Sequence, residues 1–146
     1  MQLGEARKIR FYPTINHTLK EIERMAWVKY FNPSITEARF PRLLEGGASV
    51  RTATFPKEFS TEHALSEIEN AGLTAGLFDH WVGLLLDAPS VAKEKPLICL
   101  GSSHTFMPDG EIRYPVAASN PHWQGWLLLA VKVWDPCYDV IVVEPD

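Results

Sequence analysis

Cysteine is scarce in this chain, and long apolar runs are absent. The two cysteines, Cys99 and Cys137, lie 38 positions apart, and neither belongs to a C-x-x-C pair. That spacing gives no sign of a cysteine-ligated zinc site. No apolar run follows the charged start MQLGEARKIR, so we expect no secretory leader, a cytoplasmic protein and buried, reduced thiols. The longest apolar run, 126–131, has six residues, far too few for a membrane-spanning helix.

Familiar catalytic and nucleotide-binding motifs are missing too. The chain contains neither G-x-x-x-x-G-K-[ST] nor G-x-G-x-x-G, the glycine-rich loops that cradle phosphates. It also lacks G-x-S-x-G, the turn that presents the serine nucleophile of many hydrolases. None of the five histidines forms a closely spaced pair such as H-x-H or H-x-x-x-H. If the chain binds a metal, His80, His104 and His122 are the candidate ligands to test. We therefore expect no metal and no cofactor.

The basic excess typical of nucleic-acid-binding proteins is absent, because the net charge is −4. Residues 1–57 nevertheless hold ten Lys and Arg against five Asp and Glu, whereas 58–146 hold four against thirteen. Two interpretations are open. The two parts could pack so that their charges interleave on one surface, or the first part could present a positive patch to an anionic partner. That patch would contain Arg7, Lys8, Arg10, Arg39, Arg42 and Arg51.

The residues that are present predict one globular domain over 1–146 with an α+β fold. Hydrophobic residues are 46% and charged residues 22% of the chain, which is ordinary for a domain that folds without disulfides or metals. Caps and periodicity indicate helices at 18–31 and 60–71, and strands at 8–15, 49–55, 126–134 and 138–143, with a hairpin within 96–119. The apolar run 77–86 fits either a buried helix or a strand, and its length slightly favours the helix. We expect a C-terminal antiparallel meander, about four to six strands in total, with about two to three helices mainly on one face.

The hairpin within 96–119 carries polar side chains on an apolar face. Pro108-Asp109-Gly110 has the residues of a three-residue turn, with glycine in the left-handed position. That turn pairs His104 with Tyr114 and Ser102 with Val116, so one face presents the serine, the histidine and the tyrosine among apolar neighbours. A two-residue Asp-Gly loop would instead shift every pairing by one position.

That face has two interpretations. In a small-molecule-binding or hydrolytic pocket, His104 would act as the base, Ser102 as the nucleophile or polar anchor, and Tyr114 as a hydrogen-bond donor. In a packed core, His104 would bond to Tyr114 or to a backbone carbonyl, because an unpaired buried imidazole costs about 1–3 kcal/mol.

Tryptophan is concentrated between positions 123 and 134, and tryptophan is enriched in the centres of protein interfaces. The same rings could pack against the sheet. We expect a non-enzymatic role in which Trp123 and Trp126 contact a partner protein or a second copy of the chain. A small-molecule ligand at Ser102, His104 and Tyr114 is the alternative function. We expect neither membrane nor nucleic acid as a partner.

Overall fold

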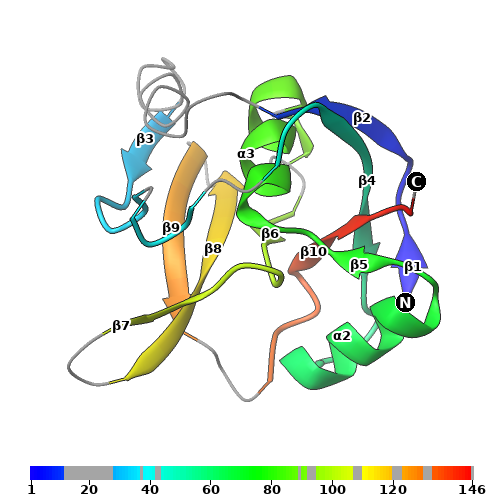
Figure 1. Cartoon of the computed structure of the whole chain (residues 1–146). Helices are drawn as coiled ribbons and strands as arrows, with labels where there is room; N and C mark the ends of the chain where they lie inside the picture. The colour runs from blue at the N-terminus through cyan, green and yellow to red at the C-terminus, as the bar shows by residue number, and fades with distance from the viewer. Residues whose placement is uncertain are drawn as a thin grey trace.

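One mixed β-sheet organises the chain (Figure 1). The computed structural model describes residues 1–11, 28–36, 38–41, 44–88, 90–91, 95–106, 110–119, 123–129 and 133–145, with the backbone alone at 28–31, 104–106, 119 and 123–129. In these ranges the strands are β1 (Gln2–Leu3), β2 (Arg7–Arg10), β3 (Val28–Phe31), β4 (Gly47–Thr54), β5 (Thr74–Ala75), β6 (Leu97–Ile98), β7 (His104–Phe106), β8 (Glu111–Ser119), β9 (Trp123–Leu129) and β10 (Asp139–Val143). The helices are α2 (Thr61–Asn70) and α3 (Phe78–Asp87).

The main path of the sheet runs β1-β4-β10-β6-β8-β9-β3, with β2 beside β4, β5 beside β10 and β7 beside β8. Strand β6 is parallel to β10, and β3 is parallel to β9. A fold that mixes helices with a sheet is confirmed. Among the described residues, however, the sheet has ten strands, is not purely antiparallel and is not confined to the C-terminal part. The reason is long-range pairing: β4 joins the centre of the sheet, with Ala53 opposite Val140.

The two helices cover opposite faces of the sheet, which corrects the expectation of helices mainly on one face. Neighbouring residues of a strand point to opposite faces. In β10, Ile141 belongs to the buried cluster that contains Trp81 of α3, whereas Val140 belongs to the cluster that contains Ile68 of α2. Because both faces are covered, the run DVIVV is almost entirely apolar.

The sequence signals for both helices are confirmed. Helix α2 begins after Ser60, whose hydroxyl accepts a hydrogen bond from the backbone N–H of His63 at 3.0 Å, and it buries only one face. Helix α3 is buried from Phe78 to Leu85, because the sheet lies on one side and Phe40 stacks on Phe78 from another. This surrounding explains why its sequence is largely apolar around the helix, with Asp79 and His80 as buried polar exceptions.

Residues 28–31 form strand β3, so the end of the helix predicted over 18–31 is wrong. The rest of that prediction lies outside the described residues. The β3 backbone pairs with β9, from Val28 opposite Trp123 to Phe31 opposite Gly125. Valine, tyrosine and phenylalanine suit a strand, and this tertiary pairing outweighs the helical spacing of the local sequence.

The cysteine prediction holds in part. Both thiols are free; Cys99 is buried, but Cys137 is exposed. In the described ranges, no helix has the length and apolar character needed to cross a membrane.

Candidate functional site

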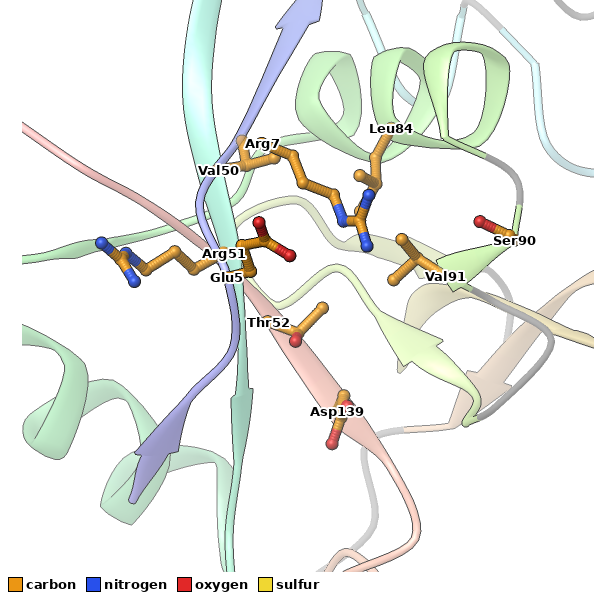
Figure 2. A pocket seen from close by; sticks show the side chains of 9 residues that line it. All are labelled: Glu5, Arg7, Val50, Arg51, Thr52, Leu84, Ser90, Val91 and Asp139. Carbon is orange, nitrogen blue, oxygen red and sulfur yellow. The ribbon is translucent and has the colours of Figure 1, made fainter.

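A polar cavity lies on the sheet face that α3 covers, beyond the end of that helix. Helix α3 packs over Val50 of β4, and two residues further along the same strand face is Thr52. The extended segment that joins β1 to β2, the end of α3 and residues 90–91 complete the walls (Figure 2). The cavity has a volume of about 140 Å³.

A buried carboxylate marks one end of this polar cavity. Asp139 is 9% exposed. Its Oδ1 accepts a hydrogen bond from the hydroxyl of Thr54 at 2.8 Å and lies 3.8 Å from the ammonium of Lys95. Its backbone N–H donates to the carbonyl of Pro96 at 2.9 Å. These contacts fix a negative charge beside the cavity, where a cationic group of a ligand could meet it.

Two charges of opposite sign flank the cavity without a partner among the described residues. Glu5 and Arg7 lie on one extended segment, two positions apart, so their side chains share a face. Figure 2 shows the guanidinium of Arg7 reaching across toward Val91, whereas the Glu5 carboxylate lies apart from it, close to β4. Neither side chain has an ion pair or a side-chain hydrogen bond to the described part of the chain.

Arg51 borders the same cavity but points away from it (Figure 2). It forms an ion pair with Glu144 and donates to the carbonyl of Gly4 at 3.0 Å. Arg10 is likewise paired with Asp87, at 2.9 Å. The positive patch considered from the sequence is thus partly neutralised by ion pairs. At this cavity, Arg7 remains as an arginine whose positive charge is not paired with a described residue. Arg42 of that patch lies outside the described residues.

Ser102 caps a helix in this structure. Its Oγ accepts a hydrogen bond from the backbone N–H of Phe78 at 2.8 Å, at the start of α3. The nearby thiol of Cys99 donates to the carbonyl of Gly76 at 3.2 Å, and burial raises the pKa of this thiol to about 12. Because the thiolate is the nucleophilic form, Cys99 is inert near neutral pH.

The structure does not pair His104 with Tyr114, as the predicted hairpin turn required. Strand β7 pairs His104 with Arg113 and Phe106 with Glu111, one position away from the predicted register, so the connecting loop is longer than the predicted turn. Gly110 does take the expected left-handed conformation, with φ of 71°. The side chain of His104 lies outside the described residues.

Tyr114 belongs to the core on the α2 face. It is 9% exposed and meets Trp134 edge to face, with ring centroids 6.1 Å apart. The indole N–H of Trp134 donates to the hydroxyl of Thr61 at 2.8 Å. Ser102 instead contacts α3, on the opposite face of the sheet. Burial raises the pKa of Tyr114, with Thr61 acting in the opposite direction, so the phenol stays protonated at neutral pH.

Trp123 and Trp126 lie on β9, opposite Ser119 and Val116 of β8. Their side chains lie outside the described residues, so their contact with a partner stays a prediction. Comparisons of this chain with protein-family models, with curated proteins and with solved structures find no match. The function must therefore be inferred from the residues and their geometry.

No sequence motif singles out Glu5, Thr52 or Asp139 as site residues. One signal was present: Asp139 is the single charged residue in the apolar run DVIVV, and a charged residue at a buried strand start is uncommon unless it is paired. The proximity of residues 5–7, 52 and 139 depends on pairing between distant strands, which local patterns do not encode.

Proposed function

We propose that the protein binds a small zwitterion of the α-amino acid class in the polar cavity. The observation that carries this proposal is the pair of unpartnered opposite charges, Glu5 and Arg7, on the wall of a cavity that also holds the buried carboxylate of Asp139. A guanidinium can donate two parallel hydrogen bonds to a ligand carboxylate. The carboxylates of Glu5 and Asp139 would accept hydrogen bonds from a ligand ammonium group.

The dimensions and hydroxyl groups of the cavity favour a small polar member of that class. A cavity of about 150 Å³ can hold benzene. A volume of 140 Å³ therefore suits a ligand with about as many heavy atoms as benzene. Thr52 and Ser90 supply hydroxyl groups that can donate and accept hydrogen bonds. L-Serine meets these requirements and is a suitable first probe.

Binding can be measured by NMR titration of the full chain with L-serine. Serinamide lacks the carboxylate and glycerate lacks the ammonium, so both should bind at least about tenfold more weakly, since a hydrogen bond to a charged group contributes about 1.5–3 kcal/mol. Arg7→Gln should reduce serine affinity to the level of serinamide. Lys8→Gln is the matched control, because Lys8 is an exposed neighbour on the opposite face of β2. Serine binding that is equal in wild type and Arg7→Gln would contradict the proposal.

A non-enzymatic interaction role through Trp123 and Trp126, in the cytoplasm, is a separate proposal that the cavity neither requires nor excludes. It is supported by the concentration of tryptophan on β9 and the adjoining segment. Sedimentation velocity of Trp123→Ala and Trp126→Ala would test it for self-association. Unchanged assembly in both variants would count against it.

A further inference from the structure

A second hollow lies at the other end of the sheet, where β10 ends and α3 begins. We call it the His80 groove, because His80 of α3 lines it together with the first residues of β4 and the residues of β5. Its volume is about 540 Å³, within the range of roughly 300–1,000 Å³ that small-molecule sites occupy. Its apolar lining includes Phe11, Leu44, Ala48, Leu77, Val143 and Pro145.

His80 is held as a neutral hydrogen-bond donor. It is 5% exposed, and burial lowers the pKa of its imidazole, although the neighbouring Asp79 acts in the opposite direction. The backbone N–H of Leu77 donates to Nδ1 at 2.9 Å, so the neutral ring carries its proton on Nε2. The ring of Phe11 meets the imidazole edge to face at 5.2 Å and limits its rotation.

The Nε2–H group of His80 has no hydrogen-bond partner among the described residues. Nε2 is not one of the fully buried side-chain atoms that lack a hydrogen-bond partner, so a molecule in the groove can reach it. Because His80 lines the groove, a ligand acceptor placed there would satisfy this donor. A ligand carbonyl oxygen is such an acceptor.

The charges of the groove select a cation. Its described lining contains the carboxylates of Glu45 and Glu144 but no lysine or arginine. Glu144 is already paired with Arg51, whereas Glu45 is exposed and makes no ion pair with the described residues. A ligand ammonium group near Glu45 would therefore gain the stronger interaction.

We propose that the His80 groove binds an apolar primary amine that also carries a carbonyl group, as in the amide of an apolar amino acid. The apolar body fills the groove, the carbonyl accepts from His80 Nε2–H, and the ammonium faces Glu45. This site is separate from the polar cavity, and its ligand differs from a zwitterion by having no carboxylate.

Three related probes separate these contacts. L-Phenylalaninamide offers the ring, the carbonyl and the ammonium; phenethylamine lacks the carbonyl, and N-acetylphenylalaninamide lacks the cation. In the wild-type chain, labelled with ¹⁵N in histidine, phenylalaninamide should shift the Nε2 signal of His80 saturably and leave His63, an exposed residue of α2, unchanged. Each reduced probe should bind about five- to tenfold more weakly.

Two variants test the assigned contacts. In His80→Met the advantage of phenylalaninamide over phenethylamine should disappear, and in Glu45→Gln the advantage over N-acetylphenylalaninamide should disappear. An advantage that persists in either variant would overturn the assignment. If His80→Met does not fold, the wild-type titration still decides: an unshifted His80 signal, or equal binding of all three probes, refutes the proposal. Serine titrations at the polar cavity are independent of either result.

Discussion

Replacing Ser102 with alanine should destabilise the fold by about 1–2 kcal/mol. Its hydroxyl accepts the backbone N–H of Phe78 at 2.8 Å and so caps α3 from a segment 24 positions away. Loss of a helix cap typically costs about 0.5–2 kcal/mol. The upper part of that range applies, because Phe78 is only 1% exposed and water cannot readily replace the lost acceptor.

Urea unfolding at neutral pH, followed by far-UV circular dichroism, measures this loss directly. The same change should lower Tm by roughly 3–8 °C for a chain of this size. Ser103→Ala is the matched control, since Ser103 is exposed, and it should stay within about 0.5 kcal/mol of wild type. Equal stability of the two variants would refute the capping role and leave Ser102 available for the chemistry first predicted from the sequence.

Gly101→Ala should cost about 3 kcal/mol in the same urea assay, because its Cβ would lie 2.4 Å from the backbone oxygen of Gly76. Gly46→Ala faces open space at φ 85° and should cost only about 1–2 kcal/mol of backbone strain; equal costs would argue against the close contact. A chromogenic disulfide reagent should titrate one thiol in the native protein, that of Cys137, and two after unfolding; rapid reaction of both native thiols would contradict the burial of Cys99. Burial lowers the pKa of His80 below 6.5, so the unfolded chain binds this proton more readily, and stability present above that pH should fall as the pH drops through it. His80→Gln, whose amide can still accept the N–H at the start of α3, should reduce this pH dependence of the unfolding free energy, and an unchanged dependence would contradict it.

Sequence patterns located most elements but not their pairing. Ser60 and the apolar stripe of α2 could be predicted from the sequence because capping and helical periodicity are local properties. The strand at 139–143 could also be predicted from its local apolar run. Its position between β4 and β6, however, depends on contacts between distant residues. The hairpin register failed because it was inferred from the turn alone, and the observed pairing of Phe106 with Glu111 closes a longer loop.

The candidate sites were harder to predict than the fold. Glu5 and Arg7 look like ordinary surface charges in sequence, and only the pairing of β1 and β2 with β4 brings them beside Thr52. His80 was noted as a possible metal ligand, but its tautomer follows from a backbone N–H that donates to Nδ1. Ser102 was predicted as a nucleophile because a sequence shows which residue carries a hydroxyl. It does not show which backbone N–H donates a hydrogen bond to that hydroxyl.

The central position of β10 has a kinetic consequence. Its first residue bonds to a side chain of β4 that precedes it by 85 positions, and helices α2 and α3 pack on alternate residues of this strand. Neither core can close until 139–143 have left the ribosome and found their place, and such distant pairing slows folding. Nascent chains should therefore expose the apolar sides of both helices until β10 has emerged, and chaperone binding would be most useful in that interval. Once β10 is inserted, its backbone amides should exchange with solvent more slowly than those of α2.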